Sequence, residues 1–592
     1  MCGIVGATAE RNIEAILLEG LKRLEYRGYD SAGMAILDTD SHHIQRRRVH
    51  GKVAALETTL QQHPLSGHIG IAHTRWATHG KPSERNAHPH TSQDCIAVVH
   101  NGIIENYRQL RAELIDLKYT FESETDSEVI AHLIHTHFQQ EKDKLTALHN
   151  TRKQLKGAYA IGILDQNDND KLYAIRSGSP LVIGVGIGEN FLASDPLALL
   201  PVTQKFIYLE EGDIAEISKT EIHIRNSDGV SVERPVHECN AEMDAATRGN
   251  FRHFMLKEIY DQPEVIAETL QCDFKNTNRV IKNIHRVHIV ACGTSFHAGL
   301  VARYWLESIA KIPAQVEIAS EYRYRNSVME PDTLFIAISQ SGETADTLAA
   351  VRHAKSLGCQ HVLAICNAAE STLAREAHAV LLTRSGKEIG VAATKTFTTQ
   401  LTALALLTLR LSNDDVEPYH EALQSLPLIV EKLLGLDILI QTISKQLMQA
   451  QHVLFVGRGN QYPIAAEGAL KLKEISYVHA ESYPAGELKH GPLALIDENM
   501  PVIVLAPSNH LFEKSVSNIQ EIRARGGDVF VLTDHDAIID DHVTTIPMPT
   551  ISDFIAPIAY TIPLQLLAYH IAVLKGTDVD QPRNLAKSVT VE

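Results

Sequence analysis

The first residues of the chain can do chemistry that no later position could. A cysteine follows the initiator methionine, and Gly3 follows the cysteine. Small residues after Met1 usually allow its removal, which would leave the thiol and the free α-amino group of Cys2 on one carbon. Because an α-amine has a reference pKa of about 7.7–8.0, part of it is neutral near pH 7 and can take the thiol proton. An ordinary buried cysteine is the alternative for Cys2 alone.

Other residues in the first third suit attack on an amide. A thiolate that attacks a carboxamide creates a tetrahedral oxyanion, which needs fixed hydrogen-bond donors. Asn101 offers a side-chain NH2 and Gly102 a backbone N–H, directly after a predicted strand at 96–99. An amino-acid substrate also carries a carboxylate, which suits Arg75, and an ammonium, which suits Asp126. Each has a structural alternative, since Asn-Gly is commonly a turn and loop charges are commonly solvated.

Taken together, these segments resemble the class II glutamine amidotransferase domain. The motifs that carry the resemblance are Cys2-Gly3-Ile4-Val5-Gly6, His73-Thr74-Arg75-Trp76-Ala77-Thr78-His79-Gly80, His100-Asn101-Gly102 and Thr125-Asp126. The resemblance implies an N-terminal-nucleophile fold, an αββα sandwich, that hydrolyses glutamine to glutamate and ammonia. By position it implies Cys2 as nucleophile, Asn101 and Gly102 as oxyanion hole, Arg75, Thr78, His79 and Asp126 as glutamine-binding residues, and Trp76 as a gate for ammonia. A core aromatic is the alternative for Trp76.

A second group of chemical residues follows two predicted strands further along the chain. Ser339-Gln340-Ser341-Gly342-Glu343-Thr344 comes after the strand at 334–338, and Thr294-Ser295 comes after the strand at 287–291. Hydroxyls and free N–H groups at a helix N-terminus favour an anion such as phosphate. Simple helix capping is the alternative. The chain has no Walker A or G-x-G-x-x-G pattern, so a nucleotide is not implied.

Three charged residues share one helical face in the last third. Glu467, Lys471 and Glu474 are spaced i, i+4, i+7, and their apolar neighbours indicate a largely buried helix. A surface Glu–Lys pair is the alternative. The turn-rich loop 483–492 is expected to place His490 nearby. Lys587 is the sixth residue from the end of the sequence, and by composition alone it would be a mobile surface charge.

The elements that position these residues suggest several domains. The segments around Gly293 and Gly459, and those around Gly358 and Gly526, repeat with spacings of 166 and 168 residues. In both copies apolar strands alternate with helices, which predicts two doubly wound parallel α/β domains. The predicted boundaries are 1–240 for the amidotransferase domain, 241–277 for a linker, 278–425 and 445–580 for the two repeats, and 581–592 for a tail. The fold class is therefore multidomain α/β.

The two repeats resemble tandem sugar isomerase (SIS) domains, and over its full length the chain resembles enzymes that join the two domain types. The resemblance implies conversion of fructose 6-phosphate and glutamine to glucosamine 6-phosphate and glutamate, the first step of amino-sugar biosynthesis. It implies a homodimer, no metal and no organic cofactor. It also implies roles for named residues: phosphate binding by Thr294, Ser295, Ser339, Gln340, Ser341 and Thr344, ring opening by His490, proton transfer by Glu474, action at the carbonyl by Lys587, and support by Glu467 and Lys471.

Composition narrows the classes of protein. With 592 residues and a net charge of −17, a nucleic-acid partner is not expected. The seven cysteines contain no C-x-x-C pair, so neither a disulfide framework nor a zinc site is indicated. The best apolar run, 401–411, is too short to span a bilayer, so we expect no membrane partner and a cytoplasmic location. The basic run 46–48 and the histidines at 132, 135 and 137 are interpreted as solvated surface.

Two other functions are alternatives to this one. A different class II amidotransferase, of the asparagine synthetase or phosphoribosyl-transferring type, would need an ATP- or diphosphate-binding signature, and the sequence shows none. A sugar-phosphate-sensing protein with an inert amidotransferase domain would not need the reactive residues. The presence of Cys2, Asn101, Asp126, Glu474 and Lys587 together argues against it.

Overall fold

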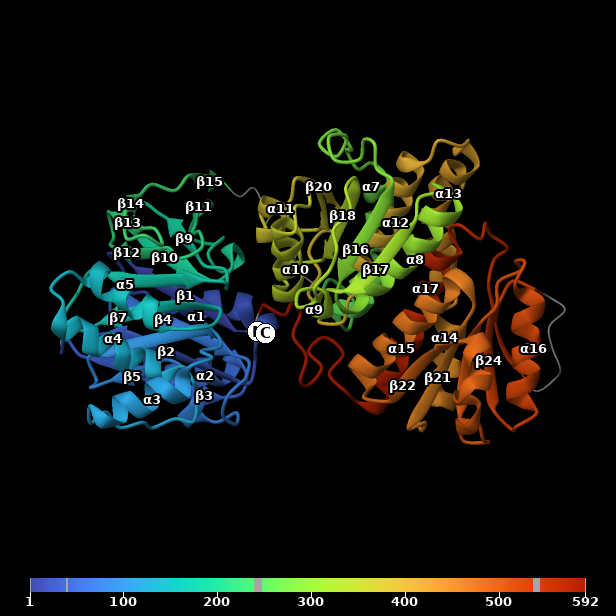
Figure 1. The fold of residues 1–592 in the computed structure, drawn as a ribbon. Coiled ribbons are helices and arrows are strands. Elements are labelled where there is room, and N and C mark those ends of the chain that lie inside the picture. The colour runs from blue at the N-terminus through green and yellow to red at the C-terminus, as the bar shows by residue number, and fades with distance from the viewer. Residues whose placement is uncertain (1, 39–40, 239–247, 536–542, 591–592) are drawn as a thin grey trace. The chain divides into compact units, whose positions relative to one another are not determined.

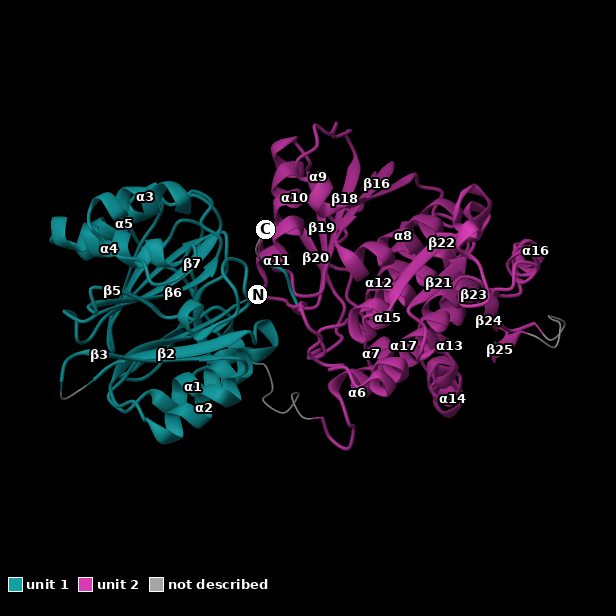
Figure 2. Ribbon diagram, turned by 90° about the horizontal axis from the view of Figure 1, so that it is seen from below, with its two compact units in different colours: residues 1–244, 588–592 teal, residues 245–587 magenta. Residues whose placement is uncertain are grey.

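The computed structural model describes residues 2–38, 41–238, 248–535 and 543–590. The chain forms two compact units, residues 1–244 with 588–592 and residues 245–587 (Figure 2). Met1 and the start of the predicted linker, 241–247, lie outside the described residues.

The first unit is built on two antiparallel sheets. The larger has the order β15-β11-β9-β10-β1-β4-β2-β3, and the smaller has the order β14-β13-β12-β8-β7-β6-β5. The strands of the larger sheet are β1 (Gly3–Thr8), β2 (Ser31–Leu37), β3 (Ile44–His50), β4 (Ile69–Arg75), β9 (Val182–Val185), β10 (Asn190–Ala193), β11 (Lys205–Tyr208) and β15 (Val236–Glu238). Those of the smaller are β5 (His90–Ser92), β6 (Ile96–Gly102), β7 (Tyr159–Asp165), β8 (Leu172–Ser177), β12 (Ile214–Ile217), β13 (Ile222–Arg225) and β14 (Ser231–Val232).

Alternating apolar side chains divide this unit into four layers. One cluster, with Ile4, Ile71 and Val99, fills the space between the two sheets. A second packs α1 (Glu14–Leu24) and α2 (Val53–Gln62) on the outer face of the larger sheet. A third packs α3 (Tyr107–Asp116), α4 (Glu128–Gln140) and α5 (Lys144–Gln154) on the smaller sheet. The predicted αββα sandwich is confirmed (Figure 1).

The second unit contains two parallel sheets of the same order, which confirms the predicted repeat. Their orders are β17-β16-β18-β19-β20 and β22-β21-β23-β24-β25. The first comprises β16 (Arg286–Ala291), β17 (Ala314–Ile318), β18 (Thr333–Ser339), β19 (His361–Cys366) and β20 (Ala379–Leu382). The second comprises β21 (His452–Gly457), β22 (His479–Pro484), β23 (Pro501–Leu505), β24 (Asp528–Thr533) and β25 (Thr544–Pro547).

Helices cover both faces of each of these sheets. α8 (Gly293–Ser308), α12 (Lys395–Leu411), α13 (Glu417–Leu434), α14 (Asp437–Leu447), α15 (Tyr462–Ser476) and α17 (Ala556–Lys575) share one continuous core with the inner faces of both sheets. α9 (Ala319–Tyr322), α10 (Ala345–Ser356) and α11 (Thr372–Glu376) lie over the outer face of the first sheet, and α16 (Phe512–Arg523) covers the outer face of the second. α6 (Phe254–Tyr260) and α7 (Gln262–Thr269) lie within the segment 241–277 that was predicted as a linker.

The structure corrects what was expected of the apolar run 401–411, the basic run 46–48 and the histidines of α4. α17, rather than 401–411, is the described helix long and apolar enough to cross a bilayer, but 89% of its apolar window is buried in the shared core. Arg46 and Arg48 are half-buried rather than fully solvated, and they donate to the carbonyl oxygens of Pro89 and Ala87.

The histidines of α4 are not solvated either. His132 and His137 are buried and bond the hydroxyls of Ser92 and Thr151, both at distances below 3 Å. A hydroxyl from another segment of the fold satisfies the hydrogen bonding of a buried neutral histidine, which lowers the cost of burying its ring. The sequence pattern does not reveal such a partner.

Candidate active sites

The backbone of Trp76 holds the thiol of Cys2. β1 pairs with β4 so that Gly3 lies opposite Thr74, which brings the start of the chain beside the residues that follow β4. The Trp76 N–H donates to Cys2 Sγ at 3.3 Å, and the thiol donates to the Trp76 carbonyl at 3.5 Å. Burial raises the pKa of the Cys2 thiol, while the Trp76 N–H and Arg75 act to lower it. The buried thiol therefore needs a base to ionise.

Asn101 lies at the end of β6 with its amide aimed at Cys2. Its Nδ2 donates to the carbonyl oxygen of Cys2 at 3.1 Å, and its Oδ1 lies 3.0 Å from His73 Nε2. Gly102 follows with φ at +135°, and a Cβ there would stand 2.1 Å from the carbonyl oxygen of Ala158. Only glycine fits this position, which keeps the backbone beyond Asn101 free of any side chain.

The predicted glutamine-binding residues flank this point. Arg75 is buried and donates to the carbonyl oxygens of His79 and Gly80, which shapes the loop after β4. Asp126 is buried and accepts the N–H of Ile104 at 2.8 Å, while His79 Nδ1 lies 3.9 Å from its other oxygen. Thr78 is exposed on the same loop. The carboxylate of Asp126 and the guanidinium of Arg75 thus lie beside the loop in which Trp76 contacts the thiol.

Asp30 is not among the predicted site residues, but its carboxylate also supports the loop after β4. Asp30, which precedes β2, accepts the N–H of Ala77 at 2.8 Å, and its own N–H donates to the Arg75 carbonyl. Ser194 similarly accepts the N–H of Ile4 at 3.0 Å. Neither contact has a sequence signal, because each joins residues far apart along the chain.

The predicted phosphate-binding hydroxyls gather at the carboxyl edge of the first parallel sheet. β16 and β18 are hydrogen-bonded neighbours, so the loops that follow them open on the same edge. Ser339 Oγ accepts the Gly342 N–H at 3.1 Å and bonds the Thr344 hydroxyl at 3.0 Å. Thr294 donates to Glu467 and Ser295 accepts from Gln400, both at 3.0 Å. Ser341 and Gln340 complete the loop after β18.

The predicted face of α15 carries a buried charge cluster. Lys471 is 1% exposed and forms ion pairs with Glu474 and, at 3.5 Å, with Glu467. Burial alone would lower the pKa of Lys471, but the two carboxylates raise it, so the ammonium stays charged. Burial raises the pKa of Glu474 above its ordinary value, against the opposing effect of Lys471. A carboxylate of raised pKa suits proton transfer.

Lys587, predicted from composition alone to be mobile, is buried in the second unit. Its Nζ pairs with Glu388 and donates to the carbonyl oxygen of Gly390 at 2.8 Å. Although burial opposes ionisation, Lys587 holds the pKa of Glu388 at about 2. The charge of Lys587 also acts to lower the pKa of Glu474, which places the tail lysine within electrostatic range of α15.

A second buried carboxylate, Glu258, braces the turn that receives Lys587. It accepts the N–H groups of Ile389 and Gly390, and its Oε2 has no hydrogen-bond partner among the described residues. Burial and the charge of Glu388 raise the pKa of Glu258 to about 7. Glu258 lies in the segment predicted as a linker, and nothing in the sequence around it indicates this role.

The elements that carry His490 and Glu474 pack on different faces of the second sheet. His490 ends the short 3-10 helix Ala485–His490, whose Ala485 and Leu488 pack with α16 on the outer face of the second sheet. Glu474 lies on α15, which packs on the inner face of that sheet. His490 itself is exposed, and the expectation that the 483–492 loop places it near Glu474 stays a prediction.

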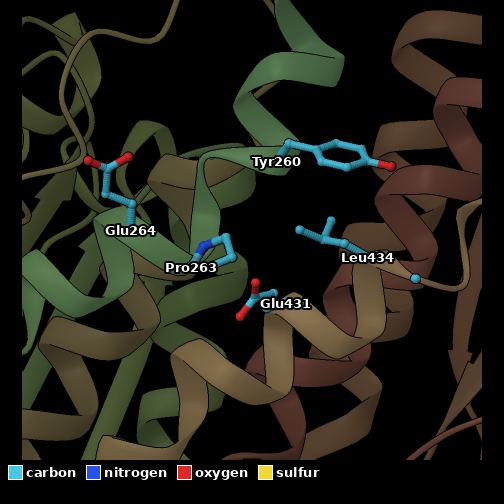
Figure 3. Close-up of a pocket in the computed structure, with 6 residues that line it drawn as sticks. Tyr260, Pro263, Glu264, Glu431 and Leu434 are labelled. Carbon is cyan, nitrogen blue, oxygen red and sulfur yellow. The ribbon is translucent and has the colours of Figure 1, made fainter.

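A separate hollow in the second unit contains none of the predicted site residues. It is lined by Tyr260, Pro263, Glu264, Glu431, Leu434 and Gly435 (Figure 3). The Tyr260 hydroxyl donates to Asp437 at 3.0 Å, and both glutamates are exposed. Throughout the described ranges, no group of three His, Cys, Asp or Glu side chains is placed to hold a metal.

Known proteins resemble this chain over its whole length. A glutamine amidotransferase domain model matches residues 73–201, and a SIS domain model matches residues 280–410 and 446–575. Glutamine–fructose-6-phosphate aminotransferases (isomerizing) of Idiomarina loihiensis and Pseudomonas syringae pv. tomato are each 57% identical, over 611 and 612 residues and 100% of both chains.

Solved structures resemble the second unit. The C-terminal domain of glucosamine-fructose-6-phosphate aminotransferase from Francisella tularensis is 46% identical, with a TM-score of 0.55 over 57% of this chain and 100% of that chain. A putative phosphosugar isomerase from Silicibacter pomeroyi is 25% identical, with a TM-score of 0.50 over 55% of this chain and 99% of that one.

The raised pKa of Glu258 predicts a pH-dependent stability. A carboxyl whose pKa is about 7 when folded, against 4.5 ordinarily, favours folding below pH 4.5, and this contribution is lost as the pH rises through 7. Glu258→Gln cannot ionise, so at pH 8 it should unfold at a higher urea concentration than the wild type. The difference in free energy of unfolding between variant and wild type should be about 1–3 kcal/mol more favourable to the variant at pH 8 than at pH 5.

Trp305 fluorescence in a Trp76→Phe background would follow unfolding of the second unit, because Trp305 is the only other tryptophan and is buried there. Glu264→Gln, an exposed change on α7, is the matched control and should show no such pH-dependent gain. Equal pH profiles for Glu258→Gln and the wild type would contradict the assignment.

Proposed function

The chain belongs to the glutamine–fructose-6-phosphate aminotransferase (isomerizing) family, and from this premise we propose how its residues divide the work. The enzyme converts D-fructose 6-phosphate and L-glutamine to D-glucosamine 6-phosphate and L-glutamate. This division of roles rests on one observation. Cys2 and the residues around its thiol lie in the first unit, whereas the buried lysines Lys471 and Lys587 lie in the second. One incubation with both substrates, scored for amino sugar and glutamate together, tests the overall reaction.

In the first unit, we propose that Cys2 attacks the carboxamide carbon of glutamine. The free α-amine, once Met1 is removed, takes the thiol proton, and the oxyanion is held by Asn101 and Gly102. Ammonia leaves, and water hydrolyses the thioester to glutamate. Arg75 would pair with the substrate carboxylate and Asp126 with its ammonium, supported by Thr78 and His79. Support comes from the Asn101 amide, which already points at Cys2.

In the second unit, the sugar phosphate would bind the hydroxyls of the loops after β16 and β18. The neutral amine of Lys587 would attack C2 of the open-chain ketose and expel water as a Schiff base forms. Ammonia would then displace the lysine amine from C2, which frees Lys587 and leaves the C2 imine of the ketose. Glu474 would next move a proton from C1 to C2, so that the amino group stays on C2 and an aldehyde forms at C1. Because Lys587 is paired with Glu388 in this structure, that pair must open or lose a proton before the amine can react. Glu467 and Lys471 would keep Glu474 in place.

Transfer of ammonia between the two sites, with Trp76 as a gate, is part of the same proposal. The supporting observation is that the Trp76 backbone touches the thiol at which ammonia is released. A cytoplasmic location also remains a prediction. It is supported by the free thiols of the described cysteines, which are typical of a reducing compartment.

A homodimer would resolve the position of His490. The 3-10 helix that ends at His490 packs on the outer face of the second sheet through Ala485 and Leu488, whereas α15, which carries Glu474, packs on the inner face. On this proposal the histidine that assists ring opening comes from a second copy. His490 is exposed and therefore available to a neighbouring chain. In symmetric dimers each copy would complete the site of the other.

We expect Cys2→Ala to abolish glutamine hydrolysis while isomerisation of fructose 6-phosphate continues, because the thiol takes no part in the sugar chemistry. Glutamate release and glucose 6-phosphate formation would be measured on the same preparation. A variant that retains Met1 should behave in the same way, since its base is an amide nitrogen. Equal loss of both activities in folded protein would overturn the two-site division.

We expect Lys587→Arg to lose synthase and isomerase activity by at least 10²-fold while glutamine hydrolysis persists, because a guanidinium with a pKa above 12 cannot form a Schiff base. Borohydride reduction with fructose 6-phosphate should attach sugar to the tail peptide of the wild type only. Lys395→Arg, another buried lysine of the second unit, is the control. Near-normal synthesis by Lys587→Arg would exclude the Schiff base.

Co-expression of His490→Ala and Lys587→Arg chains tests the dimer. If His490 acts on the partner's sugar, a mixed dimer contains one intact site, and random assortment should restore about a quarter of wild-type activity. If His490 acts within its own chain, no combination is intact and activity should stay at the level of the single variants. The mixture of separately purified, non-exchanging homodimers provides the baseline.

A further inference from the structure

A buried histidine behind Asn101 has contacts that the proposed reaction does not use. His73 lies on β4 and is fully buried. Its Nε2 lies 3.0 Å from the carbonyl oxygen of His100 and 3.0 Å from Oδ1 of Asn101. The same ring nitrogen therefore touches two oxygens, one of which belongs to the amide that faces Cys2.

The chemistry of these partners determines which atom donates. A backbone carbonyl can only accept, so Nε2 of His73 must carry its proton and donate. The Asn101 atom beside it must then be the carbonyl oxygen rather than the NH2. On the opposite side, the carbonyl oxygen of Cys2 also can only accept, so the NH2 of Asn101 faces it at 3.1 Å. The two contacts select the same orientation of the amide.

The surroundings of His73 keep this donor in place. Burial lowers the pKa of His73 to about 3, against the raising effect of its bond to Asn101, so the ring is neutral over the working pH range. The ring of His88 packs 4.1 Å away, and both of its nitrogens are buried without a partner among the described residues. Burial also lowers the pKa of His88, so no protonated neighbour adds a charge beside His73.

We propose that His73 is a positioning residue of the oxyanion hole, which orients the Asn101 amide so that its NH2 points toward the oxygen of the substrate carbonyl that Cys2 attacks. The proposal rests on the oxyanion role of Asn101 given above. The oxygen and nitrogen of the Asn101 amide are nearly isosteric, and without His73 only the Cys2 carbonyl oxygen would select between the two orientations. Rotation of the amide by 180° would aim its carbonyl oxygen at the developing oxyanion. The hole would then repel the charge that it has to stabilise.

His73→Leu removes the donor, and His73→Gln replaces it with an amide NH2 of similar reach. Loss of one oxyanion donor costs about 10²–10³-fold in kcat, so His73→Leu should lower kcat for glutamine hydrolysis by roughly 10–100-fold. KM and inhibition by glutamate should stay within about twofold, and His73→Gln should recover most of the rate. His137→Gln, a buried histidine bonded to Thr151 and distant from the thiol, is the control that should change nothing.

Alkylation of Cys2 by iodoacetamide separates positioning from damage to the fold. That displacement forms no tetrahedral oxyanion, so its rate, followed by mass spectrometry of the amino-terminal peptide, should be unchanged in His73→Leu. A parallel loss of alkylation and hydrolysis would assign His73 a structural role and overturn the proposal.

A double-mutant cycle with Asn101→Ala distinguishes the positioning role of His73 from the oxyanion role of Asn101. If His73 acts through Asn101, His73→Leu should cause little further loss in the Asn101→Ala background. Full hydrolysis by Asn101→Ala would show that the oxyanion role itself is wrong. Loss in Asn101→Ala with normal activity in His73→Leu, or with fully additive losses, would refute only the positioning role of His73.

Discussion

The ammonium groups of Lys471 and Lys587 are buried in the second unit, and the arrangement of the sugar site depends on how they are paired. An unpaired charge in a protein interior costs several kcal/mol, so each lysine needs carboxylates at hydrogen-bonding distance. Lys471 takes Glu467 and Glu474 from its own helix, and Lys587 takes Glu388 from a loop 199 residues earlier in the chain. The second pairing ties the tail to the sugar site, and Glu258 braces the turn that makes it possible.

The amidotransferase site depends on backbone contacts more than on ion pairs. The thiol is held between the N–H and the carbonyl of Trp76, and the loop that carries Trp76 is shaped by Arg75 and Asp30. These contacts exist because β1 lies centrally in its sheet, between β4 and β10. A chain terminus is usually mobile, but here a central strand begins one residue after the nucleophile, which restricts its position.

Several parts of both sites were predictable because their signal is local. The i, i+4, i+7 spacing of Glu467, Lys471 and Glu474 predicts one helical face, and α15 has it. The repeated order of strands and glycines predicts two parallel sheets, and both are present. Interpretations that depended on surroundings were less successful: Arg46 and Arg48 bind loop carbonyls, and His132 and His137 of α4 are buried.

The sequence by itself determined the residue types, their spacing and the fold class, because period, turn chemistry and strand order are properties of neighbouring residues. It also supplied the family through motifs that are contiguous in the chain. Tertiary structure alone decided which groups meet: His73 with Asn101, Lys587 with Glu388, and Glu467 with Thr294. It also decided the protonation of Glu258 and His73, since the pKa of each is set by burial and by partners from distant segments.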